Sequence, residues 1–194
     1  MADAPRVVIL AGSNGAGKTT AARTVLADTL GVMTFLNADV IAAGLSGFDP
    51  EGVAFEASRI MLERLHTLAA QRADFAFETT LAARTYAPWL RSLQASGYRV
   101  LLFYVWLPDV KLAIERVAIR VSQGGHSIPE DTIKQRYTRS VRNFHQLYSP
   151  FVDEWTVYDN SMTGVYRVIA EGGQGDSLSI HNPQLWASFS QGAR

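Results

Sequence analysis

The sequence predicts an α/β fold, in which a mostly parallel central sheet carries helices on both faces. Short apolar segments alternate along the chain with longer segments of helical period. A glycine-rich turn joins the first apolar segment to the first helical one. Hydrophobic residues make up 47% of the 194 residues and charged residues 19%, so the chain can fill a core. The length corresponds to about one domain.

The expected strands are the short apolar segments, which lie at 6–11, 32–36, 74–78, 99–107, 155–159 and 165–171. The segment 99–107 is almost continuously apolar, which is typical of a central strand covered on both faces. Five segments of helical pattern are expected at 19–30, 50–73, 86–97, 110–122 and 130–151. Asp49 is a plausible N-cap for the second of them, and Gly31 and Gly97 are stop signals.

Composition excludes several classes of protein. Eighteen basic and eighteen acidic residues give no net charge, so a uniformly basic nucleic-acid-binding domain is excluded. The chain has no cysteine and therefore no disulfide framework. The longest apolar run, 100–107, is far short of the ~20 residues of a membrane helix. The first residues lack the pattern of a signal peptide, so we expect a soluble, cytoplasmic protein without membrane contact.

The turn after the first strand carries the clearest chemical signal. Its sequence, GSNGAGKTT, matches the phosphate-binding pattern G-x-x-x-x-G-K-[ST] between a strand and a helix. Lys18 is expected to reach the β- and γ-phosphates of a nucleoside triphosphate, and Thr19 to offer its hydroxyl to Mg²⁺. The expected nucleotide-binding residues of the turn are Gly12, Ser13, Asn14, Gly15, Ala16, Gly17, Lys18, Thr19 and Thr20. The fold class is therefore a P-loop NTPase-like three-layer sandwich.

Two carboxylates follow expected strands, at the sheet edge where α/β proteins bind ligands. Asp39 is the candidate base that accepts a proton from an acceptor hydroxyl. Glu78, followed by two threonines, is the candidate for the Mg²⁺ shell or for binding the acceptor. The segment 49–52 resembles the D-x-x-G of GTPases, but it precedes a helix and no N-K-x-D follows, so we interpret it as a helix cap.

Positive charge is concentrated in residues 111–142, which carry seven basic and three acidic side chains. Arg116 and Arg120 are four residues apart and share a helix face. A Gly-Gly loop then leads through His126 to a helix with Arg136 on it. This pattern favours a hinged helical lid whose arginines neutralise phosphate charge in the transition state.

Together these segments resemble the zeta toxin family of P-loop kinases. The matching residues are 12–20, Asn37-Ala-Asp39, Phe77-Glu-Thr-Thr80, 124–130, Arg136-Tyr-Thr-Arg-Ser140, Asn143-Phe144 and Tyr158-Asp-Asn-Ser161. The resemblance covers residues 6–170, and the Gly-Gly-His version is similar to a smaller chromosomal branch.

The resemblance implies ATP- or GTP-dependent transfer of a phosphoryl group to a nucleotide-activated sugar such as UDP-N-acetylglucosamine, and an antitoxin as protein partner. It implies Lys18 and Asp39 as phosphate lysine and base, and Arg116 as a phosphate-stabilising arginine, with Arg120 beside it. The family has a second arginine near His126, so Arg120 or Arg136 is expected to substitute. His126 and Arg136 are expected among the nucleotide-binding residues. The expected acceptor-site residues are Asn37, Asp39, Glu78, Thr80 and Arg84, and the expected metal ligands are Thr19 and Glu78.

The domain organisation that follows is a kinase domain at 1–171, with a lid at about 111–142, and an appendage or tail at 172–194. Two other functions stay open. One is a P-loop kinase for a nucleoside, a polyol or a nucleic-acid end. The other is a nucleotide-dependent switch that binds a partner through an apolar tail surface containing Leu185, Trp186 and Phe189.

Overall fold

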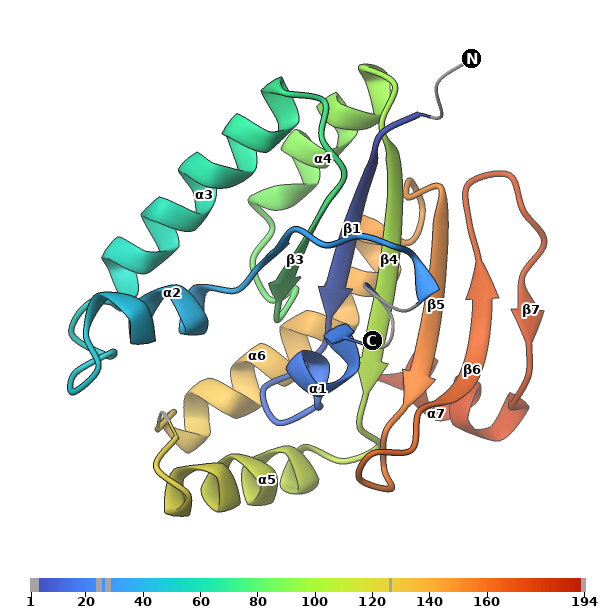
Figure 1. Ribbon diagram of the computed structural model, residues 1–194. Helices are drawn as coiled ribbons and strands as arrows, with labels where there is room; N and C mark the ends of the chain where they lie inside the picture. The colour runs from blue at the N-terminus through green and yellow to red at the C-terminus, as the bar shows by residue number, and fades with distance from the viewer. Residues whose placement is uncertain (1–3, 24–25, 27–28, 126, 193–194) are drawn as a thin grey trace.

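The computed structural model describes residues 4–23, 26, 29–125 and 127–192. A seven-stranded sheet in the order β2-β3-β1-β4-β5-β6-β7 runs through its centre (Figure 1). Strands β1 to β5 are parallel, while β6 and β7 are antiparallel, which confirms the predicted fold class. The strands are β1 Arg6–Ala11, β2 Phe35–Leu36, β3 Phe75–Thr79, β4 Arg99–Trp106, β5 Glu154–Asp159, β6 Arg167–Gly172 and β7 Ser179–Ile180.

Helices pack on both faces of this sheet. They are α1 Lys18–Ala22, α2 Ala38–Leu45, α3 Ala54–Ala70, α4 Tyr86–Ala95, α5 Val110–Ser122, α6 Glu130–Asn143, the π-helix η2 Phe144–Tyr148, and α7 Pro183–Gln191. Alternate side chains of β1 enter two different cores, as the period of a strand requires. Val7 and Ile9 pack with α3, α4 and α7, whereas Val8 and Leu10 pack with α1 and α5. No helix in the described ranges is both long and apolar enough to cross a bilayer.

Several helices differ from those expected from the sequence. The helix α2 was not predicted from the sequence; Asn37 caps it by accepting from the N–H groups of Asp39 and Val40. Asp49 does not cap α3, which begins later, at Ala54; its carboxylate accepts from Gly52 N–H instead. The helix expected at 130–151 continues only to Asn143 and then widens into the π-helix. The first part of the helix expected at 19–30 is α1, and the segment after α1 includes residues outside the described ranges.

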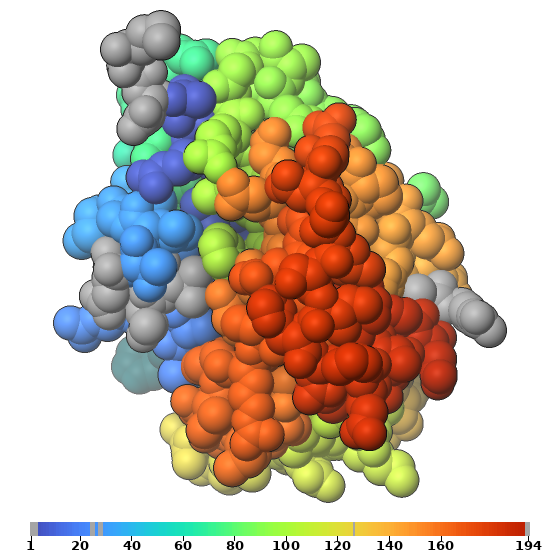
Figure 2. All heavy atoms as spheres, turned by 90° about the vertical axis from the view of Figure 1, so that its right-hand side faces the viewer, coloured from blue at the N-terminus to red at the C-terminus, as the bar shows by residue number. Residues whose placement is uncertain are grey.

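The C-terminal residues are packed against the sheet rather than forming an exposed apolar surface. Strand β7 pairs with β6, and α7 follows it. Figure 2 shows the red C-terminal segment packed against the orange segments that precede it in the chain. Phe189 is fully buried, and Trp186 stacks on Trp155 with ring centroids 5.6 Å apart. Leu185 also packs against the core. The hypothesis that these three apolar residues form a partner surface is therefore wrong, because they cover the chain's own sheet.

Replacing Phe189 with alanine is expected to destabilise the whole domain by about 3–5 kcal/mol, because a large buried ring is lost from the aromatic core. The free energy of unfolding is measured by urea denaturation. Leu178→Ala is the control at a side chain that is 48% exposed, where a change within about 0.5 kcal/mol is expected. Equal small losses in both variants would show that α7 contributes little to the fold.

Candidate active site

The phosphate-binding turn lies between the end of β1 and the start of α1. Gly12, Gly15 and Gly17 all have positive φ, at 141°, 74° and 89°. Residues other than glycine rarely adopt this backbone conformation. A Cβ at Gly12 would lie 2.1 Å from the carbonyl oxygen of Val105, so glycine is also required there for the close approach to β4. The backbone therefore has the shape of a loop that turns N–H groups inward around an anion.

Lys18 is the buried cation of this turn. Its Nζ donates to the Ser13 carbonyl at 2.9 Å and lies 3.5 Å from Glu78 Oε1. The side chain is only 6% exposed. An ammonium group held this deeply beside a carboxylate needs that partner, because an unpaired buried charge is costly.

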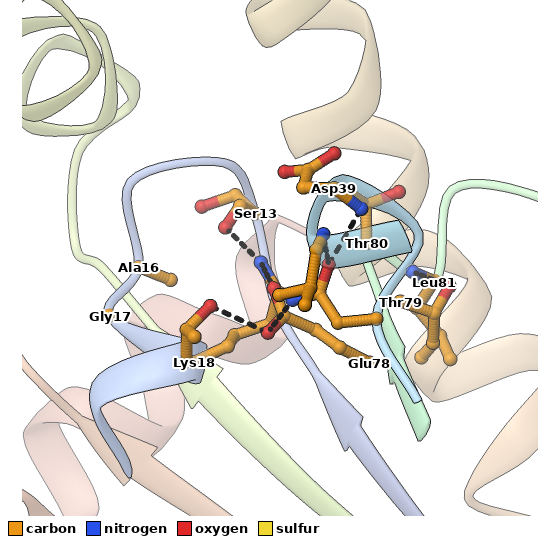
Figure 3. A network of polar contacts seen from close by, with 12 residues as sticks. Ser13, Ala16, Gly17, Lys18, Asp39, Glu78, Thr79, Thr80 and Leu81 are labelled. Carbon is orange, nitrogen blue, oxygen red and sulfur yellow. Dashed lines mark hydrogen bonds and ion pairs between the residues drawn. The ribbon is translucent and has the colours of Figure 1, made fainter. Parts of the chain in front are cut away.

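Glu78, at the carboxyl end of β3, is the centre of the polar network (Figure 3). Its Oε2 accepts from the Thr19 hydroxyl at 2.7 Å and from the Asn37 amide at 2.8 Å. Together with Lys18, these contacts join three elements that are far apart in sequence. The structure thus brings together four of the residues expected from the sequence: the lysine and threonine of the phosphate turn, the α2 cap and the β3 carboxylate.

Asp39 lies in the first turn of α2, directly beyond the Asn37 cap. It is exposed, and within the described ranges its recorded polar contact is through its backbone N–H, to Asn37 Oδ1 at 2.8 Å. In Figure 3 its side chain lies beside the Lys18–Glu78 network and does not take part in it. Its carboxylate oxygens are consequently available to accept a hydrogen bond from a hydroxyl group of a bound molecule.

The loop from β3 to α4 carries two more of the expected acceptor residues, Thr80 and Arg84. Thr80 Oγ1 accepts from the Ala82 N–H at 3.4 Å, whereas the side chain of Arg84 is exposed. Asn143 holds this loop from α6, by donating to the carbonyls of Leu81 at 2.8 Å and Ala82 at 3.1 Å. The phenol of Tyr148 donates to the Ala83 carbonyl at 2.9 Å. Burial raises the pKa of Tyr148, so its phenol stays a donor at neutral pH.

The expected lid arginines occupy different places. Arg116 lies beside the phosphate turn, since a Cβ built on Gly15 would lie 3.3 Å from the Cβ of Arg116. The Arg116 guanidinium donates to the Ser161 carbonyl at 3.0 Å. Arg120, near the C-terminus of α5, packs under the Gly-Gly loop. Arg136 is exposed on α6. His126 lies outside the described residues, so its expected role stays a prediction.

The contacts that hold the phosphate turn from the β5–β6 side were not predicted from the sequence. Asn160 Nδ2 donates to the Ala16 carbonyl at 2.7 Å, and Tyr166 Oη donates to the Gly17 carbonyl at 2.8 Å. Both come from the turn between β5 and β6. Asn160 belongs to the Tyr158-Asp-Asn-Ser161 segment, which had drawn attention only through the family resemblance. Nothing in the sequence around Tyr166 indicated its contact.

The residues present fit a triphosphate. In the part of the chain that the structure describes, Ser13 Oγ and Asn14 Oδ1 are buried and have no hydrogen-bond partner. Buried polar atoms without partners are rare, so these two unpartnered atoms in the phosphate turn indicate that a polar ligand binds there. Thr19 and Glu78 are oxygen donors of the kind that Mg²⁺ prefers. The described residues contain no cluster of three or more His, Cys, Asp or Glu that would bind a metal without a nucleotide.

Comparison with known families agrees with this geometry. The zeta toxin family model matches residues 2–169, which include the phosphate turn, the Glu78 network and the β5–β6 turn. The chain belongs to the zeta toxin family. A relative from Haemophilus influenzae, described as an uncharacterized protein, is 28% identical over 132 residues, which are 68% of this chain and 92% of that protein.

Solved structures share the P-loop kinase fold of this zeta toxin family member. The AvrRxo1-ORF1:AvrRxo1-ORF2 structure with sulphate ions has a TM-score of 0.78 at 17% identity, and the one with ATP has 0.76 at 18%. They cover 96% and 97% of this chain, which spans 63% and 64% of theirs. The PezAT chromosomal toxin–antitoxin system of Streptococcus pneumoniae has a TM-score of 0.63 at 14% identity, covering 98% and 86% of the two chains.

Proposed function

We propose that this zeta toxin family protein transfers the γ-phosphoryl group of ATP or GTP to a hydroxyl group, most consistently that of a nucleotide-activated sugar such as UDP-N-acetylglucosamine. The observation that carries the proposal is the Lys18–Glu78–Thr19–Asn37 network, with Asp39 at its rim. A nucleotide-dependent switch needs the phosphate turn, but it does not need an acceptor base beside it.

In the proposed reaction, Lys18 and the turn backbone would hold the β- and γ-phosphates, and Thr19 and Glu78 would hold Mg²⁺. Bound Mg²⁺ supplies charge neutralisation for the transferring group. Asn37 orients Glu78 through its amide and places Asp39 through its cap, so one residue sets the positions of both carboxylates. Asp39 accepts the proton of the acceptor hydroxyl.

Acceptor recognition is assigned to the β3–α4 loop. Thr80 and Arg84 lie on this loop, which the side chains of Asn143 and Tyr148 hold in place. Arg84 offers a fork of donors suited to the phosphates of a nucleotide-activated acceptor. Arg116, Arg120 and Arg136 are assigned to the charge of the triphosphate, with 111–142 acting as the lid.

A protein inhibitor is part of the same proposal. One structural relative is the AvrRxo1-ORF1:AvrRxo1-ORF2 structure, and another is from the PezAT toxin–antitoxin system. By analogy with these fold relatives, we propose that an antitoxin controls the activity of this chain. The proposed domain organisation is a kinase domain at 1–171, with 172–194 as an appendage that packs on it.

The acceptor is tested by mass spectrometry of metabolites from cells that express the wild-type chain or the Lys18→Ala variant. The expected result is a nucleotide-activated sugar that gains one phosphate only with the wild type. The purified chain with ATP, Mg²⁺ and UDP-N-acetylglucosamine must then give the same product. A phosphorylated nucleoside, polyol or nucleic-acid end would instead identify another acceptor, and release of inorganic phosphate alone would favour the switch.

A further inference from the structure

The carbonyl groups of the phosphate turn need partners on the side away from the ligand. In a trans peptide the C=O and the following N–H point in opposite directions within one plane. Turning the N–H groups of Gly17 and Lys18 toward an anion therefore turns the carbonyls of Ala16 and Gly17 away from it. Whatever binds these two carbonyls also sets the direction of the two N–H groups.

Both carbonyls are bound by the β5–β6 turn, about 145 residues later in the chain. Asn160 donates to the Ala16 carbonyl, 144 residues earlier, at 2.7 Å. Tyr166 donates to the Gly17 carbonyl, 149 residues earlier, at 2.8 Å. The Gly17 carbonyl also accepts the first helical bond of α1, from Ala21 N–H at 3.1 Å. The phenol is thus a second donor, from outside the helix, that restrains this peptide.

The β5–β6 turn is itself held firmly. The Asn160 side chain is 2% exposed, and its backbone N–H donates to the Trp106 carbonyl at 3.1 Å. The Asp159 carboxylate accepts from both the N–H and the hydroxyl of Ser161, at 2.9 and 2.8 Å. Burial raises the pKa of Tyr166, so its phenol is protonated and donates throughout the neutral range.

Contact between the two turns is close. A Cβ at Gly17 would lie 2.4 Å from Asn160 Nδ2 and 3.1 Å from Tyr166 Oη, so these donors occupy the space where a side chain would be. Arg116 donates to the Ser161 carbonyl of the same β5–β6 turn at 3.0 Å. A single turn therefore sets the positions of both the phosphate-binding backbone and the arginine beside it.

We propose that Tyr166 is a positioning residue for phosphoryl transfer: its hydroxyl fixes the Gly17–Lys18 peptide so that the Lys18 N–H faces the bound phosphates. The inference rests on the proposed nucleotide-dependent kinase function. Tyr166 does not touch the nucleotide; it acts through the peptide that does. Asn160 has the same role for the Ala16–Gly17 peptide.

The test is the affinity of Tyr166→Phe for ADP with Mg²⁺, measured by titration calorimetry. Removing the hydroxyl while keeping the ring is expected to weaken ADP binding about tenfold, equivalent to about 1.4 kcal/mol. The amide resonance of Lys18 in the ADP complex is expected to shift, because its peptide is no longer fixed. Asn160→Asp, which removes the donor to Ala16, is expected to weaken ADP binding as well.

Tyr98→Phe is the matched control. Tyr98 precedes β4, and its phenol also donates a hydrogen bond to a backbone carbonyl, that of Ala73 at 3.0 Å. Its ADP affinity is expected to equal that of the wild type, whatever its thermal stability. ADP affinity of Tyr166→Phe within about twofold of the wild type would overturn the positioning role, as would equal losses in Tyr166→Phe and Tyr98→Phe. A wild-type chain that binds no ADP would instead overturn the proposed function, and the inference with it.

Discussion

Replacing Lys18 with alanine is expected to lower kcat at least about 100-fold, the scale of losing one preorganised transition-state contact. The lysine is buried between the Ser13 carbonyl and Glu78, so its loss removes a cation held inside the phosphate turn. Its removal also leaves the Glu78 carboxylate facing the triphosphate, and like charges repel. Both effects act against binding and transfer together. The measurement is the initial rate of ADP formation with a saturating acceptor.

The control for Lys18→Ala is Arg59→Ala. Arg59 is an exposed cation on α3 that pairs with Glu63 one helical turn away. Exposed pairs of this kind contribute less than about 1 kcal/mol, so this variant is expected to keep wild-type turnover. A kcat for Lys18→Ala close to that of Arg59→Ala would mean that the phosphate turn is not the catalytic centre.

Most of the fold was predictable because its core elements carry strong local patterns. The strand 6–11 and the helix 110–122 have in the structure the bounds that the sequence indicates. By contrast, α2 spans only eight residues and is apolar at almost every position, with Val40 and Leu45 exposed, so no polar face marks it as a helix in the sequence. The two-residue strand β7 is too short to show any period.

The site was predictable to the extent that its residues follow strands. A phosphate-binding pattern after β1 and a carboxylate at the end of β3 meet because parallel strands end at the same edge of the sheet. The contacts of Asn160 and Tyr166 follow no such rule, because they depend on how the β5–β6 turn packs against a loop more than 140 residues earlier. Only the three-dimensional structure identifies them.

The second large effect is expected for Asp39→Ala, which should lower kcat about 10²–10⁴-fold, the usual contribution of a positioned general base. Glu78 is poorly placed to substitute for it. Its Oε2 already accepts from Thr19 and Asn37, and its Oε1 faces Lys18. Asp39 offers an exposed carboxylate beside the network, so it is the base that we propose for the acceptor hydroxyl.

Nucleotide affinity separates this role of Asp39 from a structural one. Asp39 is not part of the phosphate turn, so calorimetry should give Asp39→Ala an ATP affinity within about twofold of the wild type. Glu56→Gln is the matched control, because Glu56 is also a first-turn acid, on α3, and its removal costs a similar helix-dipole contribution without touching the network. Full turnover in Asp39→Ala would assign the base to another residue. Loss of ATP binding together with turnover would instead place Asp39 in the nucleotide site.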